Sequence, residues 1–197
     1  MDKGLKGATM DTVAASLGMS KRTIYEIFES KSDMLKETFR QLEIENKELV
    51  KRTMESSMNV MEGLISVFRF NRDWLSSLNV DFFRDMDRLY KDERKRYDES
   101  RRTRYQEMKA LFDRGVKEGM FREDVDFIVQ SRIMGIQMES LKRMEEVFPQ
   151  DITLLRVYDA IILGFLRSIA SEKGMKVLDK LSGEFIHNKK EEKKTVI

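Results

Sequence analysis

Apolar residues recur every three or four positions along most of the chain, which is the spacing of one face of an α-helix. This pattern predicts three helices between Thr9 and Val50, followed by a longer amphipathic segment from Met58 to Leu75. A break at Asn79–Asp81 precedes a short predicted helix from Phe82 to Tyr90. One proline and ten glycines leave few helix breakers among many good helix formers. The chain is therefore predicted to be all-α.

The two helices predicted next are the most apolar part of the chain. The first runs from Phe127 to Phe148 and should end there, because the residue before Pro149 is pushed out of the helical region. The second begins near Ile152 and is apolar on two sides, so it needs two burial partners. We expect one partner to be the core and the other a second copy of the chain. The residues predicted to lie in this dimer interface are Ile133, Ile136, Leu154, Tyr158, Ile161 and Phe165.

Residues 9–35 carry the pattern of a helix-turn-helix, in which the second helix enters the major groove of DNA. Thr9 is placed to cap the first helix, and Ala14 and Ala15 allow the helices to approach closely. Gly18 can take the left-handed conformation that ends this helix. Ser20 is placed to cap the second helix, and Ser30-Lys-Ser-Asp33 resembles a capping box that opens the third. The residues expected to project outward from the second helix are Lys21, Arg22, Thr23 and Tyr25.

This segment resembles the TetR family of one-component transcriptional regulators. The resemblance rests on the turn Leu17-Gly-Met-Ser-Lys21, on Thr-Ile-Tyr at 23–25, and on Phe28 followed by Ser30-Lys-Ser-Asp-Met-Leu35. A weaker likeness at Glu118–Asp126 corresponds to the loop between the family's seventh and eighth helices. The rest of the chain matches the family only in the lengths and order of its helices.

The resemblance implies a homodimer that binds a near-palindromic operator, usually as a repressor. A small molecule would enter the C-terminal domain and change the spacing of the two reading helices. It also implies that Thr9, Tyr25 and Lys31 contact phosphates, while Ser20, Lys21, Arg22 and Thr23 lie at or near the groove. Arg22 is the best candidate for a guanine edge, which its forked side chain can bind at two points.

Three segments follow from these expectations: a helix-turn-helix domain at 1–50, a helical effector-binding and dimerisation domain at 51–187, and a disordered charged tail at 188–197. The first helix of the family is expected to be absent, because only eight residues precede Thr9. Its loss would remove part of the cover of Val13, Ile24 and Phe28. Either the sequence begins late, which we favour, or the alternative holds: a helical dimer that binds a small molecule or protein but no longer DNA.

Composition excludes several other classes of function. Apolar residues make up 41% and charged residues 37% in both signs, which suits amphipathic helices better than disorder. There is no cysteine, and the single histidine, His187, lies beside the charged tail, so we expect no metal site, no cofactor and no enzyme activity. No apolar run approaches the ~20 residues that span a bilayer, so we expect a cytoplasmic protein without a membrane partner. The basic stretch Arg94–Arg104 is interpreted as a solvated helix face rather than a second nucleic-acid site.

The effector pocket is expected among the helices that follow Val50. Aromatic and methionine side chains suit apolar ligands, and the polar ends of Trp74 and Tyr90 need partners. Most such residues in a helical domain are ordinary core. The candidates are Phe68, Trp74, Phe82, Phe83, Met86, Tyr90, Met108, Phe112, Met134 and Met138.

Overall fold

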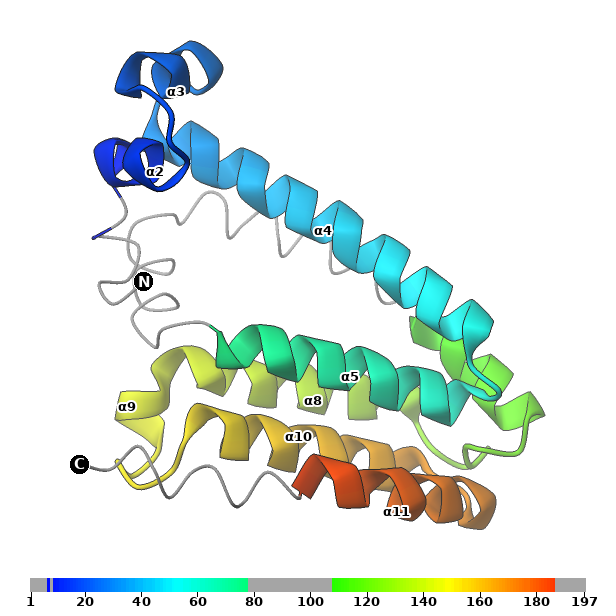
Figure 1. Cartoon of the computed structure of the whole chain (residues 1–197). Helices are drawn as coiled ribbons and strands as arrows, with labels where there is room; N and C mark the ends of the chain where they lie inside the picture. Colours follow the sequence, from blue (N-terminus) through cyan, green and yellow to red (C-terminus); the bar gives the residue numbers. More distant parts are fainter. Residues whose placement is uncertain (1–6, 8, 78–107, 187–197) are drawn as a thin grey trace. The chain divides into compact units, whose positions relative to one another are not determined.

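A computed structural model of the 197-residue chain describes residue 7 and residues 9–77 and 108–186. Within these ranges the regular elements are helical, and the only strand-like contact is an isolated antiparallel bridge between Phe121 and Ala170. The predicted all-α class is confirmed. Helices are numbered here as in Figure 1.

The first three described helices begin where the sequence predicts. They are α2 (Met10–Ser16), α3 (Lys21–Ile27) and α4 (Lys31–Ser56). The Thr9 hydroxyl accepts the Thr12 amide at 3.1 Å and the Ser20 hydroxyl accepts the Thr23 amide at 3.1 Å, so both predicted caps are confirmed. The Ser30 hydroxyl accepts the Asp33 amide at 3.1 Å and caps α4. This helix runs beyond the predicted end near Val50.

The chain divides into two compact units. One contains Met1–Leu49 and Ser76–Thr103, and the other contains Val50–Leu75 and Arg104–Ile197. α4 is continuous across the boundary, so its N-terminal part belongs to the first unit and its last turns belong to the second.

The second unit is a bundle built around two long apolar helices. α5 (Val60–Ser76), α8 (Phe127–Ser140), α10 (Leu154–Ile169) and α11 (Glu172–Ile186) run alongside one another in Figure 1. A further helical segment ends at residue 117. Met61 and Ile65 of α5 and Ile162, Leu166 and Ile169 of α10 are at most 1% exposed and belong to the core. Burial of one such side chain is worth about 1.5–3 kcal/mol, so these residues contribute strongly to the stability of the unit.

The helix predicted to run from Phe127 to Phe148 is interrupted. α8 ends at Ser140, and a 3₁₀ turn, η1 (Leu141–Arg143), and the short α9 (Met144–Val147) follow it. The backbone leaves the helical region at Arg143, whose φ is −125° and ψ is 40°. No helix in the described ranges is long and apolar enough to cross a membrane. The predictions for Phe82–Tyr90, Arg94–Arg104, the first-helix region and the tail from 188 concern segments outside the described residues.

Candidate nucleic-acid interface

α3 is held against α2 by a small apolar core. Ile24 is 2% exposed and is the one buried side chain of α3. It packs with Met10, Ala14 and Met34, while Val13, Met19 and Phe28 are partly buried around them. Ile24 therefore anchors one side of α3, and Lys21, Arg22 and Tyr25 are exposed on this helix.

The turn between α2 and α3 is set by one glycine. Gly18 has φ +64° and follows the last turn of α2. The Met19 amide donates to the Ala14 carbonyl at 2.9 Å and the Gly18 amide donates to the Ala15 carbonyl at 3.2 Å. These paired bonds form a Schellman motif, which satisfies carbonyls at the helix end and redirects the chain into α3.

The start of α3 presents two cations and a tyrosine to solvent. Lys21 lies 2.8 Å from the Asp11 carboxylate, and Arg22 Nε donates to Glu26 Oε1 at 2.9 Å. The hydrogen bond and charge of Asp11 raise the pKa of Lys21. The Arg22 side chain is 89% exposed, and the half-exposed ring of Tyr25 has the Lys21 ammonium 5.9 Å from its centroid. Exposed ion pairs of this kind contribute ~1 kcal/mol or less, so other anions can replace Asp11 and Glu26 at small cost.

The hydroxyl groups predicted to contact DNA form helix caps in the structure. Thr9 and Ser20 are exposed, and their oxygens accept the capping amides already described. Ser20 and Thr23 also share a hydroxyl–hydroxyl bond of 2.9 Å. Lys31 is half-buried at the first position of α4. The seven predicted DNA-facing residues therefore fall within the first unit, and Lys21, Arg22 and Tyr25 are exposed there.

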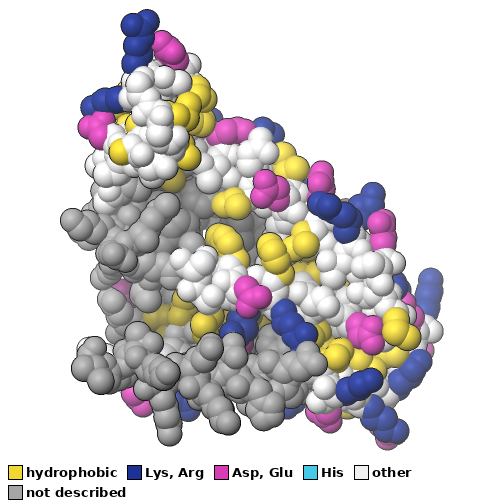
Figure 2. Space-filling view, viewed as in Figure 1, with side chains coloured by type: hydrophobic (Ala, Val, Ile, Leu, Met, Phe, Trp, Pro, Cys, Tyr) yellow, Lys and Arg dark blue, Asp and Glu magenta, His cyan; other side chains and the backbone are white. Residues whose placement is uncertain are grey.

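Acidic residues accompany the basic ones over this surface. Figure 2 shows Lys and Arg side chains of the helix-turn-helix and α4 lying beside Asp and Glu side chains rather than forming one basic patch. Arg40 on α4, for example, binds Glu37 at 2.6 Å. Affinity for an anionic partner must therefore come from the placement of individual cations, as the near balance of charge in the sequence already indicates.

The predicted effector-pocket residues are divided by the structure. Phe68 and Phe112 are buried; Phe112 stacks on Phe127 with ring centroids 4.6 Å apart, and so belongs to the core. Trp74 is 39% exposed, and Met108, Met134 and Met138 are half-buried. The remaining four candidates, Phe82, Phe83, Met86 and Tyr90, lie outside the described residues.

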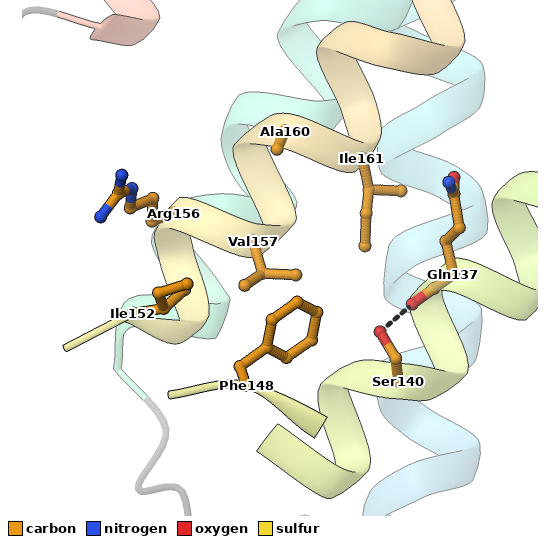
Figure 3. A pocket seen from close by; sticks show the side chains of 8 residues that line it. All are labelled: Gln137, Ser140, Phe148, Ile152, Arg156, Val157, Ala160 and Ile161. Atoms are coloured by element: carbon orange, nitrogen blue, oxygen red, sulfur yellow. Dashed lines mark hydrogen bonds between the residues drawn. The ribbon is translucent and has the colours of Figure 1, made fainter. Parts of the chain in front are cut away.

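A groove of about 390 Å³ opens elsewhere in the second unit, where α8 ends and α10 begins. Figure 3 shows the Phe148 ring facing Val157, with the Gln137 side chain near Ile161 and the Arg156 guanidinium turned outward. The sequence analysis did not predict this groove. The signal available was Phe148-Pro149, which separates the two apolar helices and so indicates a place where their packing is interrupted. The lining residues are Gln137, Ser140, Phe148, Ile152, Arg156, Val157, Ala160 and Ile161.

The residues predicted to lie in the dimer interface differ in how far they are buried. Tyr158, Ile161 and Phe165 are at most 8% exposed, so they are buried in the chain's own core and leave little area for a partner. Ile133 and Ile136 are 44% and 72% exposed, and Leu154 is half-buried. An interface on this side of α8 would therefore use the isoleucines rather than the α10 residues.

Together, the fold and the reading helix define an all-helical protein with an N-terminal helix-turn-helix. Residues 1–38 match the family described as bacterial regulatory proteins, tetR family. Residues 1–38 are thus similar to the N-terminal domain of that family, and the described helices share their fold with solved transcriptional regulators. No curated protein matches the chain.

Solved structures share this fold at low sequence identity. The ketosteroid transcriptional regulator KstR2 of Mycobacterium tuberculosis is 22% identical over 86% of this chain and 88% of that chain, with a TM-score of 0.56. A protein from Saccharomonospora viridis, assigned as a transcriptional regulator and solved with choline, is 18% identical over 86% and 91%, with a TM-score of 0.63. The superantigen pfit is 15% identical over 86% and 82%, with a TM-score of 0.54. At these identities the likeness concerns the fold alone.

Proposed function

We propose that this chain is a ligand-responsive DNA-binding regulator that acts in the cytoplasm as a homodimer and represses transcription from a near-palindromic operator. The family of its N-terminal domain supports DNA binding. Two-fold symmetry of the protein would match two half-sites whose centres lie one helical turn of DNA, ~34 Å, or a multiple of it apart.

The observation that carries this proposal is the arrangement of α3. Ile24 anchors the helix to the apolar core, while Lys21, Arg22 and Tyr25 are exposed on it. In the complex, the Arg22 fork would exchange Glu26 for the O6 and N7 atoms of a guanine. The Tyr25 hydroxyl and Lys31 would bind nearby phosphates, which set the register of the helix on the duplex, and Lys21 would lie at or near the groove.

We propose that the second unit binds an apolar small molecule. Its groove of about 390 Å³ is within the size range of small-molecule sites, and Val157 and Ile161 give it an apolar wall. Arg156 makes no ion pair within the described residues and could turn toward an acidic group on such a molecule. The fluorescence of the single tryptophan, Trp74 in α5, offers a readout of ligand binding to this unit.

The decisive experiment is a salt titration of binding to the intergenic DNA upstream of the gene, against random DNA of equal length. We expect a sequence-preferring complex whose affinity falls with salt as counterions are released. Arg22→Ala should weaken binding to the preferred site by ~1–3 kcal/mol and relax the preference at one base pair in each half-site.

Arg143→Ala is the matched control, because Arg143 also forms an exposed pair, with Glu146, but lies in the second unit. It should leave the preference unchanged. Equal affinity of the parent protein for upstream and random DNA would show that the regulator proposal is wrong.

A further inference from the structure

The end of α4 is joined to the start of α5 through two charged side chains of a neighbouring segment. Arg114 Nη1 donates to the Met54 carbonyl at 3.0 Å, and Arg114 Nε donates to Glu118 Oε1 at 2.6 Å. The second carboxylate oxygen, Oε2, accepts the Val60 amide at 2.7 Å. We call this chain of contacts, from Met54 through Arg114 and Glu118 to Val60, the α4–α5 clamp. All of its members belong to the second unit.

Both helix ends held by the clamp carry backbone groups that need an outside partner. Met54 lies in the last turn of α4, where carbonyls have no partner within the helix, and Val60 is the first residue of α5, where amides have none. A cation at a helix C-terminus and an anion at an N-terminus also suit the helix dipoles. The Arg114 and Glu118 side chains are 38% and 26% exposed, so their bonds are less screened than those of surface pairs.

An apolar contact beside the clamp limits how the two helices can move. Met54 is 5% exposed and its side chain lies over Gly63 of α5. A Cβ atom at Gly63 would stand 2.5 Å from Met54 Sδ, so a larger residue there would require the Met54 side chain to move. α4 therefore contacts α5 through the Met54 side chain as well as through the clamp.

The turn that carries Glu118 is itself fixed to the core. Lys173 Nζ donates to the Glu118 carbonyl at 2.9 Å, and the Ser171 hydroxyl donates to the Gly119 carbonyl at 2.6 Å. The Ser171 amide donates to the Met120 carbonyl at 2.9 Å. These bonds link the turn to the start of α11, so the clamp is attached to the bundle rather than to a free loop. Figure 1 shows α4, α5 and the helical segment ending at residue 117 meeting at one end of this unit.

We propose that Arg114 and Glu118 are positioning residues that fix the direction in which α4 leaves the second unit, and thereby where α3 reaches DNA. α4 is one continuous helix of 26 residues. Such a helix is ~39 Å long, so a tilt of ~5° at the clamped end displaces the other end by ~3 Å. A shift of that size breaks hydrogen bonds to base edges. The consequence for DNA rests on the proposed function, whereas the effect on α4 does not.

The test measures the distance between two spin labels in the full chain, without DNA or effector. The chain has no cysteine, so Lys36→Cys on α4 and Lys176→Cys on α11, both at exposed positions, give two specific labels. Dilution with unlabelled chain restricts the measurement to distances within one chain. Glu118→Gln and Arg114→Lys should each shift or broaden the distance distribution by ~3 Å or more.

Asp113→Asn is the matched control. It removes an exposed i,i+4 pair, Lys109–Asp113, in the same helical segment, and this pair is not a member of the clamp. Its distribution should equal that of the parent. Unchanged distributions in folded Glu118→Gln and Arg114→Lys, or equal broadening in Asp113→Asn, would overturn the proposal. If Glu118→Gln fails to fold, the charge-conserving Arg114→Lys decides alone. A failure to bind operator DNA would bear on the proposed function and leave this result unaffected.

Discussion

The turn of the helix-turn-helix depends on the backbone conformation of a single residue, Gly18. Gly18 holds a positive φ, and an added Cβ there would find nothing within 4 Å. A substitution at this position therefore strains the backbone without creating a clash. The change in unfolding free energy caused by a substitution of Gly18 therefore measures the backbone strain in the turn, without a contribution from steric clash.

Gly18→Ala should destabilise the first unit by roughly 1–2 kcal/mol, which is the cost of an L-residue in the left-handed conformation. Gly18→Asn should cost less, because asparagine tolerates this region better. Hydrogen exchange of the Met19 amide, which is bonded to Ala14 in the turn, measures the opening free energy. Equal exchange rates in Gly18→Ala and the parent protein would contradict the assigned role of the turn.

For single residues, the sequence predicts those roles that depend on hydrogen bonds to residues close by in the chain. The caps at Thr9 and Ser20 and the turn at Gly18 were predictable because each satisfies amides or carbonyls within a few residues. The pairing of Lys21 with Asp11 was not, because ten positions separate the two residues and only the folded turn brings them together. Burial of Ile24 was predictable from helical spacing alone.

Whole helices depend on contacts that spacing does not reveal. The sequence predicts one helix from Phe127 to Phe148, because apolar positions continue without a proline or a breaking glycine. The structure ends α8 at Ser140, continues through η1, and leaves the helical backbone at Arg143, whose φ is −125° and ψ is 40°. The groove beside Phe148 lies next to this interruption, so the helix prediction and the cavity were missed at the same place. The spacing of apolar residues shows which face of a helix is apolar, but it does not show where the helix ends.

The pairing of α5 with α10 includes one buried polar bond with a measurable pH signature. The Tyr158 hydroxyl donates to the Phe68 carbonyl at 3.0 Å. Burial, reinforced by the charge of Asp159, raises the pKa of Tyr158 well above its usual range. The neutral phenol is thus favoured in the folded state, while in the unfolded chain tyrosine ionises near pH 10. The stability from this group is present below about pH 10 and is lost as the pH rises above it.

Tyr158→Phe should lower the free energy of unfolding by ~1 kcal/mol at neutral pH through the lost hydrogen bond. It should also remove part of the fall in stability above pH 10, where one such group contributes up to ~1.4 kcal/mol per pH unit. Denaturant unfolding followed by Trp74 fluorescence measures both effects. Tyr25→Phe, at a half-exposed tyrosine in the first unit, is the control and should retain the slope. A slope that persists in Tyr158→Phe would assign the alkaline loss to other groups.

At the scale of the whole molecule, the described part of the chain leaves an apolar stripe exposed on α8. Val129, Ile133 and Ile136 recur on one side of α8 and are 47%, 44% and 72% exposed. Isolated exposed apolar residues are ordinary, but a stripe on one helix marks an interaction surface. A two-fold dimer would bury the same stripe from both copies, which is the simplest closed solution. The sequence indicated an unpartnered face but placed four of its six residues on α10, because spacing cannot tell which apolar side of that helix packs on its own core.

Ile136→Lys tests this assignment, because a lysine at the most exposed position of the stripe would be buried without a counter-charge in the dimer. The resulting penalty is several kcal/mol, enough to shift micromolar protein toward monomers. Light scattering should give a dimer mass for the parent chain and a monomer mass for the variant. Met58→Lys, at an 89% exposed methionine outside the stripe, should remain dimeric. A dimer in both variants would move the interface away from α8, and a monomeric parent would remove the two-fold symmetry on which binding to a palindromic operator depends.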